Sequence, residues 1–240
     1  MINQKQIKSL HQKKYREHYN LFIIEGVRSF ISAVEASAKI KLIFYTIEFS
    51  KKNPWLKKKL YQIPNKIVSI EKIKKLSPVK SPSGILAICE IPEFNLLDKK
   101  KNLIYLDSLS DPGNLGTIIR TAAWFGVNQI GYSKQSIDPF NPKVVRSAMG
   151  SHFNLSWLGE LSLNDIKEYE IIGADHRGKS LEEVQPFNKK WALIMGNESH
   201  GISDNIKKAI KHLVSIPKIG EGESLNVGVS LGILLHELTK

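Results

Sequence analysis

Three stretches of the chain share one pattern, in which an apolar run ends at a cluster of Gly, Asn, Ser or Asp and a helix-like segment follows. They span residues 107–126, 192–201 and 213–240. In an open α/β sheet, ligands bind at the carboxyl ends of the strands. The polar side chains at these turns are therefore the first candidates for a chemical role, although each could also have a purely structural role.

Arg120 stands within an otherwise apolar helical stretch, residues 118–123. A buried guanidinium without a partner is strongly unfavourable. Two interpretations therefore stay open. Either Arg120 faces a substrate in a binding site, or it forms a salt bridge on the surface of the helix.

Each of four other polar residues also has both a functional and a structural interpretation. Asn114 follows Asp-Pro-Gly and precedes a helical segment, so it is a site residue, a helix N-cap, or both. Glu198 lies in a glycine-containing loop after a strand, where it is either a site acid or a solvated loop residue. Ser224 and Asn226 flank Leu225 where the last helix should begin, and Ser224 is the candidate N-cap for that helix.

The last helix-like segment, residues 225–238, is almost uncharged until His236 and Glu237. A helix that is apolar all round is buried inside a domain. Chain ends are normally loose and polar, so other elements must surround this one. The loop before it contains Gly220 and Gly222, and glycines allow the main chain to approach a ligand closely.

Composition excludes several classes of protein. The chain has 240 residues, 42% of them hydrophobic, which suffices for one large or two small domains. No apolar run is long enough to span a membrane, and the start of the chain lacks an apolar signal core. Cys89 is the only cysteine, so we expect no disulfide and no cysteine metal cluster. None of the seven His pair at zincin spacing, so we expect no metal site. Together these points favour a cytoplasmic protein. No GxGxxG or GxxxxGK[ST] motif is present, which argues against a Rossmann dinucleotide enzyme, a Rossmann methyltransferase and a P-loop protein.

The positive charge is concentrated in the first part of the chain. The net charge is +12, and residues 1–92 hold 18 of the 35 Lys and Arg but only 6 of the 23 acidic residues. Residues 102–240 are nearly balanced, with 14 basic and 15 acidic residues. Such asymmetry predicts that the first part meets a polyanion. The alternative is that the lysines serve only as general solubilisers.

The alternation of apolar runs and helical patterns predicts an α/β protein with two domains. A small domain, residues 1–92, is joined by a linker, 93–101, to a larger domain, 102–240, with a mostly parallel sheet and helices on both faces. We expect the larger domain to fold without the smaller one. The expected strands are 21–24, 40–49, 66–70, 85–90, 103–106, 129–132, 169–174, 191–195 and 213–216, and the expected helices include 51–60, 71–76, 114–125, 142–149, 204–211 and 224–238.

The polar residues also form an ordered set of motifs. Asn114-x-Gly116-x-x-x-Arg120, the stretch Met195-Gly196-Asn197-Glu198-x-x-Gly201, and Ile216-Pro217 followed by Glu223–Val227 resemble the three motifs of the SpoU family of RNA ribose methyltransferases, within the SPOUT superfamily. The match covers about the last 140 residues. Residues 22–28 and 83–87 resemble the substrate-binding domain, similar to the ribosomal protein L30e fold, that precedes many SpoU catalytic domains.

The resemblance implies a fold and a chemistry. The family's chain end is threaded as a trefoil knot, and its members act as homodimers. It implies S-adenosylmethionine as cofactor, held at Gly196, Asn197, Ile216, Pro217, Leu225 and Asn226, and a catalytic set of Arg120, Asn114, Glu198, Ser224 and Asn226. Arg120 would lower the cost of forming the ribose alkoxide. Because a guanidinium is very hard to deprotonate, whether it also takes the proton stays open.

The resemblance favours an enzyme that methylates the ribose 2′-hydroxyl of structured RNA, with 23S ribosomal RNA ahead of transfer RNA. A non-catalytic RNA-binding protein is the alternative from another class, but such a protein should have lost Arg120, Glu198 or Asn226, and all three are present. Two positions depart from the family pattern. Gly228 stands where Ser is frequent, and Trp124 replaces a residue that is often acidic.

Overall fold

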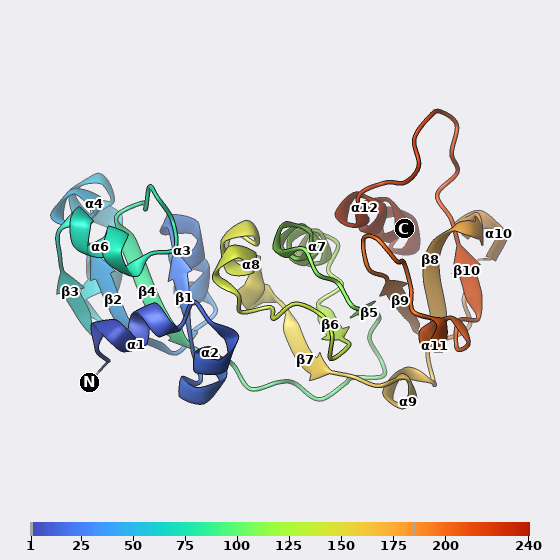
Figure 1. The fold of residues 1–240 in the computed structure, drawn as a ribbon, viewed down its shortest axis with the longest axis horizontal. Helices are drawn as coiled ribbons and strands as arrows, with labels where there is room; N and C mark the ends of the chain where they lie inside the picture. The colour runs from blue at the N-terminus through green and yellow to red at the C-terminus, as the bar shows by residue number, and fades with distance from the viewer. Residues whose placement is uncertain (1, 185) are drawn as a thin grey trace. The chain divides into compact units, whose positions relative to one another are not determined.

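The computed structural model describes residues 2–184 and 186–240. The chain forms two compact units (Figure 1). The first unit contains residues 2–92 together with Asp138–Phe153, and the second contains Glu93–Ile137 together with Asn154–Lys240. No helix among the described residues is both long and apolar enough to cross a bilayer.

The first unit is built on a four-stranded sheet with the order β1-β4-β2-β3. The central strand β4 is antiparallel to both of its neighbours, and β2 and β3 are parallel. The strands are β1 (Leu21–Glu25), β2 (Ile40–Tyr45), β3 (Asn65–Ile67) and β4 (Ile85–Glu90). The helices are α1 (Gln4–Ser9), α2 (Lys13–Tyr19), α3 (Val27–Glu35), α4 (Ile47–Lys52), η1 (Pro54–Leu56), α5 (Lys57–Tyr61) and α6 (Ile70–Leu76).

Three expectations for this unit were wrong. The strand expected over 66–70 ends at Ile67, and α6 begins at Ile70. The strand expected over 40–49 ends at Tyr45, because the Thr46 hydroxyl accepts a hydrogen bond from the Phe49 amide at 3.0 Å and begins helix α4. The single helix expected over 51–60 is broken after Lys52, since Pro54 cannot donate a backbone hydrogen bond and begins a separate 3-10 turn.

The second unit contains a six-stranded sheet in which every neighbouring pair is parallel, so the predicted mostly parallel sheet is confirmed. The strand order is β10-β8-β9-β5-β6-β7. The strands are β5 (Leu103–Leu106), β6 (Gln129–Tyr132), β7 (Ser156–Glu160), β8 (Glu170–Lys179), β9 (Trp191–Met195) and β10 (His212–Val214). The edge strand β7 was not expected.

Helices cover both faces of this sheet (Figure 1). One core joins alternate strand residues such as Tyr105 and Ile194 to Ile166 and Ile206 of the helices α9 (Leu163–Ile166) and α11 (Asp204–Lys207). On the other side, α7 (Pro112–Trp124) and α12 (Val227–Leu238) pack against each other. The short helix α10 (Leu181–Val184) contacts α12 and β10. The trefoil knot of the chain end stays a prediction.

Residues 138–153, which contain α8 (Pro142–Ser147) and all but the last residue of η2 (Ser151–Asn154), pack within the first unit although they lie between β6 and β7 in sequence. The Phe140 ring lies 5.0 Å from that of Phe22 on β1. A chain that starts near Asn102 would carry this segment without its packing partners, so we no longer expect it to fold alone. The division into 1–92, 93–101 and 102–240 stays a prediction about modules in the sequence.

Candidate functional site

Glu198 lies just beyond the carboxyl end of β9, and its carboxylate receives hydrogen bonds from the loop that precedes α7. Its Oε1 accepts from the Asp111 amide at 3.0 Å and from Asn114 Nδ2 at 3.0 Å. Its Oε2 accepts from the amide and the hydroxyl of Ser110, at 3.2 and 2.9 Å. Both carboxylate oxygens are therefore engaged by donors that lie far away in the sequence.

The donors determine the charge of Glu198. Burial by itself raises the pKa of the carboxyl group, but the hydrogen bonds from Asn114, Asp111 and Ser110 together outweigh burial and lower the pKa below its usual value. Glu198 is therefore ionised at neutral pH. An ionised carboxylate accepts hydrogen bonds only, which suits a residue that fixes the backbone around it.

Asn114 connects Glu198 to the start of the last helix. While its Nδ2 donates to Glu198, its Oδ1 accepts from Asn226 Nδ2 at 2.7 Å. Asn226 in turn accepts at Oδ1 from the Gly228 and Val229 amides, at 2.9 and 3.4 Å. One chain of hydrogen bonds thus joins all three motif segments at one edge of the parallel sheet.

The structure corrects both N-cap assignments. Helix α7 begins at Pro112 and its N-cap is Asp111, whose Oδ1 accepts from the Asn114 amide at 2.8 Å. Helix α12 begins at Val227 and its N-cap is Asn226, so Ser224 lies in the loop before it. The Asn114 side chain is therefore not used for capping and is free to join Glu198 to Asn226.

Arg120 projects from the second half of α7 and is exposed. Among the described residues, no carboxylate forms an ion pair with it. The surface salt bridge considered as its structural role is thus not formed. An exposed guanidinium without an acidic partner can meet a polyanion, and it presents five donors to phosphate or hydroxyl oxygens.

The loop after β9 is closed by its own backbone. Asn197 and Gly201 exchange two backbone hydrogen bonds of 2.9 Å, and the Asn197 side chain donates to the Ser108 carbonyl at 2.7 Å. Gly196 cannot carry a side chain, since a Cβ there would lie 2.3 Å from the Gly201 carbonyl carbon. The glycine is thus required for the tight return of this loop, which holds Glu198 at its tip.

The loop between β10 and α12 presents its main chain to solvent. Within the described residues, no backbone–backbone hydrogen bond involves residues 216–225. Ser224 and Leu225 are exposed, as is Pro217, and Ile216 is partly exposed. The Gly222 carbonyl accepts from Lys218 Nζ at 2.6 Å. Amides and carbonyls that lack backbone partners at the edge of a parallel sheet can bind a nucleoside-like ligand through the main chain.

The structure therefore joins Asn114, Glu198 and Asn226 by direct contacts. Asn197 belongs to the same network through Ser108. Arg120, Ser224, Ile216, Pro217 and Leu225 lie on the adjoining helix and loop, and no described hydrogen bond ties their side chains to that network. Among the described residues no group of three or more His, Cys, Asp or Glu is placed to hold a metal ion.

Three residues of the site were not singled out from the sequence. Ser110 and Asp111 donate to Glu198, and Asp107 is buried with its Oδ2 accepting from the Ser203 amide at 2.6 Å. Asp107 directly follows β5, so the rule that predicted Glu198 could also have identified it. Ser110 acts partly through its backbone amide. Every residue except proline has such an amide, so the sequence does not indicate this role.

Two protein-family models and several known proteins are similar to this chain. A family model described as SpoU rRNA Methylase family matches residues 101–236, and one described as MRM3-like substrate binding domain matches residues 3–87. The 23S rRNA (guanosine(2553)-2′-O)-methyltransferase of Bacillus subtilis is 32% identical over 247 residues, covering 96% of this chain and 93% of that protein.

Other similar proteins include an enzyme of mitochondria and a solved structure. Human rRNA methyltransferase 3, mitochondrial, is 32% identical, covering 94% of this chain and 69% of that protein. The crystal structure of an AdoMet-bound rRNA methyltransferase from Sinorhizobium meliloti superposes with a TM-score of 0.85 at 27% identity, covering 98% of this chain and 93% of that one.

Proposed function

Because the chain belongs to the SpoU rRNA methylase family, whose members use S-adenosylmethionine, we propose that it transfers a methyl group to a ribose 2′-hydroxyl of large-subunit ribosomal RNA. The observation that carries the proposal is the joining of the three motif segments through Glu198, Asn114 and Asn226. A chain that bound RNA without catalysis would have no need to keep this network intact.

In this proposal Arg120 meets the ribose that receives the methyl group. The exposed guanidinium lies on α7, four residues after Gly116 and on the helix whose first turn is fixed by Glu198. It stabilises negative charge on the 2′-oxygen as the proton leaves, or binds the adjoining phosphate. The cofactor supplies an activated methyl group, so the protein's main contribution is to align the reacting atoms.

The cofactor is proposed to lie against the loops that follow β9 and β10. Gly196, Asn197, Ile216, Pro217 and Leu225 would contact it, largely through the main chain. The lack of backbone–backbone hydrogen bonds over the described residues 216–225 supports this assignment, since adenine and amino-acid groups are well recognised by amides and carbonyls. Glu198 and Asn226, joined through Asn114, would hold the surrounding segments in place. Ser224 would line the site.

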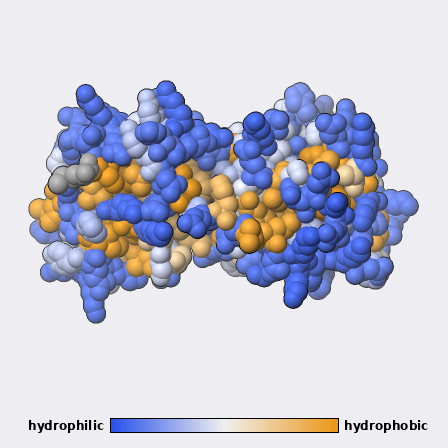
Figure 2. All heavy atoms as spheres, turned by 90° about the horizontal axis from the view of Figure 1, so that it is seen from below, coloured by the Kyte–Doolittle hydropathy of each residue, from blue (hydrophilic) through white to orange (hydrophobic). Residues whose placement is uncertain are grey.

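The first unit is proposed to bind the RNA. Its lysines are mostly exposed, and hydrophilic side chains dominate the face of the molecule in Figure 2, with apolar patches between them. Lys and Arg on such a surface bind phosphates and give affinity without sequence preference. We expect the protein to act in the cytoplasm.

The substrate is tested by mapping ribose methylation in total RNA from cells with and without the gene. We expect one 2′-O-methyl group on large-subunit ribosomal RNA to disappear without the gene and to return when the gene is restored. Restoring an Arg120→Ala copy should not bring it back. Loss of a methyl group from transfer RNA alone would contradict the ribosomal assignment, and an unchanged ribose methylation map would contradict the proposed function.

A homodimer is also proposed, formed through α7 and α12. These two helices pack against each other and leave large apolar side chains exposed, with Trp124 85%, Val229 49% and Ile233 39% accessible. Val229 and Ile233 are four residues apart and thus share one face of α12. An apolar patch of this kind marks a protein interface.

The dimer is tested by light scattering at micromolar concentration. We expect a mass twice that of the 27.1 kDa chain. The Val229→Glu and Ile233→Glu double variant should be monomeric, because the interface would then bury two unpaired charges. The exposed apolar residue Ile47 of the first unit provides the control, and its replacement by Glu should leave the mass unchanged. A monomer in the unaltered protein would overturn the proposal.

A further inference from the structure

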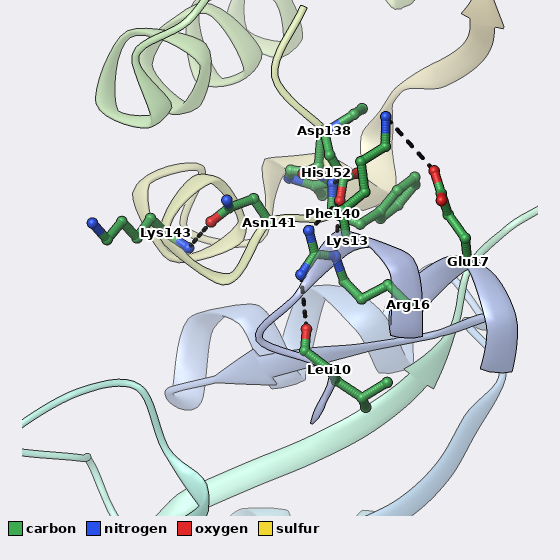
Figure 3. Close-up of polar contacts among 10 residues, drawn as sticks. Leu10, Lys13, Arg16, Glu17, Asp138, Phe140, Asn141, Lys143 and His152 are labelled. Atoms are coloured by element: carbon green, nitrogen blue, oxygen red, sulfur yellow. Dashed lines mark hydrogen bonds and ion pairs between the residues drawn. The ribbon is translucent and has the colours of Figure 1, made fainter. Parts of the chain in front are cut away.

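Arg16 on α2 is a charged residue that the reaction does not use, yet it is only 2% exposed. Its Nε donates to Asp138 Oδ2 at 2.8 Å, its Nη2 donates to the same oxygen, and its Nη1 donates to the Leu10 carbonyl at 2.8 Å (Figure 3). A charge is kept in the protein interior only when it is fully paired. All three nitrogens of the guanidinium are engaged here.

Asp138 is held equally firmly. While Oδ2 accepts from Arg16, Oδ1 accepts from the Phe140 amide at 2.8 Å, and the Asp138 carbonyl accepts from the Asn141 amide at 3.1 Å (Figure 3). The nearby His152 does not neutralise Asp138, because burial lowers the pKa of His152 to about 4 and leaves it uncharged at neutral pH. Arg16 is therefore the cation that balances this carboxylate.

The residues directly before Asp138 belong to the second unit and are hydrogen-bonded to the loop after β5. The Ile137 amide donates to the Leu109 carbonyl at 2.8 Å. The Ser136 hydroxyl donates to the Leu106 carbonyl at 3.0 Å, and Ser133 Oγ accepts from the Ser108 amide at 2.8 Å. The segment 133–137 is therefore hydrogen-bonded to Leu106, Ser108 and Leu109.

Residues 106–109 lead directly into the candidate site. The next two residues, Ser110 and Asp111, supply three of the four donors to Glu198. A continuous path of covalent and hydrogen bonds thus runs from Arg16 through Asp138, Ile137 and Leu109 to Glu198. At its far end, Glu198 binds Asn114 and thereby the start of the last helix.

We propose that Arg16 is a positioning residue for methyl transfer, because it anchors Asp138 and so fixes the segment that supports the Glu198 donors. Arg16 itself touches neither the ribose nor the cofactor. It connects the packing of the first unit with the geometry of the site through the Ile137–Asp138 peptide bond. The expected fall in kcat rests on the proposed function. The expected effect of Arg16 on the order of residues 106–111 does not depend on it.

The test compares Arg16→Met and Arg16→Lys in the full-length protein. Arg16→Met removes the cation, whereas Arg16→Lys keeps the charge but cannot reproduce the planar set of donors. The control is Lys99→Met, which removes a solvent-exposed ion pair with Glu168 in the second unit, away from the lysines proposed to bind RNA. Steady-state kinetics with RNA and S-adenosylmethionine are measured beside amide hydrogen exchange of residues 106–111 and 137.

We expect Arg16→Met to lower kcat about 10- to 100-fold, since misplacement of a site by about 1 Å has effects of this size. The KM for S-adenosylmethionine should stay unchanged, and exchange at residues 106–111 should accelerate. Arg16→Lys should fold, and its kcat and its exchange rate at residues 106–111 should lie between those of Arg16→Met and of the unaltered protein. Lys99→Met should change neither kcat nor the exchange at residues 106–111.

A role confined to folding would lower the unfolding temperature but leave kcat per folded molecule and exchange at 106–111 unchanged, which would overturn the inference. If Arg16→Met does not fold, the inference is tested with Arg16→Lys alone, by its kcat per folded molecule and its exchange at residues 106–111. If the unaltered protein methylates no RNA, the proposed function has failed, and the exchange measurement still decides whether Arg16 fixes the loop.

Discussion

The Arg120→Ala variant is expected to transfer methyl groups about 100- to 1000-fold more slowly than the unaltered protein, the usual effect of removing one group that stabilises charge in a transition state. Its affinity for S-adenosylmethionine should be nearly unchanged, because Arg120 is assigned to the ribose rather than to the cofactor. The fold should also be retained. Arg120 is exposed on α7, and alanine is a better helix former than arginine.

Calorimetry of cofactor binding beside a methylation assay separates these two effects. Arg120→Lys is the matched variant, since it keeps the charge and loses the fork of donors. It should recover part of the activity if Arg120 acts mainly through its charge. It should recover little activity if the arrangement of the guanidinium donors is what matters. Near-normal turnover of Arg120→Ala would remove Arg120 from the catalytic set.

Glu198→Gln is expected to lower both activity and stability. The glutamine amide has one acceptor oxygen, whereas the carboxylate offers two to Ser110, Asp111 and Asn114. The amide NH₂ would face donors that it cannot satisfy. Each amide left without an acceptor costs about 1–3 kcal/mol if water does not replace it. The unfolding temperature and turnover should fall together. Cofactor affinity should also fall, because Glu198 joins the loop after β9, which we propose contacts the cofactor, to the start of α7.

Acid should reproduce the effect of this variant. The folded-state pKa of Glu198 is lowered, so its contribution to stability is fully present above the pKa of the unfolded chain and is lost as pH falls through the folded pKa. The exposed Glu182 provides a control, since Glu182→Gln should be silent. A Glu198→Gln variant with unaltered stability and turnover would show that the network is not needed.

The sequence predicted that the motif residues would lie close together, because they follow the ends of predicted strands. The parallel sheet brings those ends to one edge, which is why Glu198 meets Asn114 and Asn226. The role of each side chain was harder to predict. Two cap-competent residues stand close together at the start of each helix, Asp111 with Asn114 and Ser224 with Asn226, and only the backbone path decides which one caps.

The packing of residues 138–153 could not be predicted from the sequence. The segment follows β6 after only five residues, 133–137. Sequential elements usually pack as neighbours. Its placement depends on the Arg16–Asp138 pair and on aromatic contacts such as that of Phe140 with Phe22, which join residues more than a hundred positions apart. Neither Arg16 nor Asp138 carries a local pattern that indicates a partner.

The most direct measurement uses purified full-length protein, unmethylated large-subunit ribosomal RNA and S-adenosylmethionine labelled in the methyl group. The RNA is digested to nucleosides, and the labelled product is identified by mass spectrometry. The proposed function predicts a single 2′-O-methylnucleoside, formed by the unaltered protein and missing with Arg120→Ala. Label on a base rather than a ribose, or no label in RNA although the protein binds S-adenosylmethionine, would contradict it.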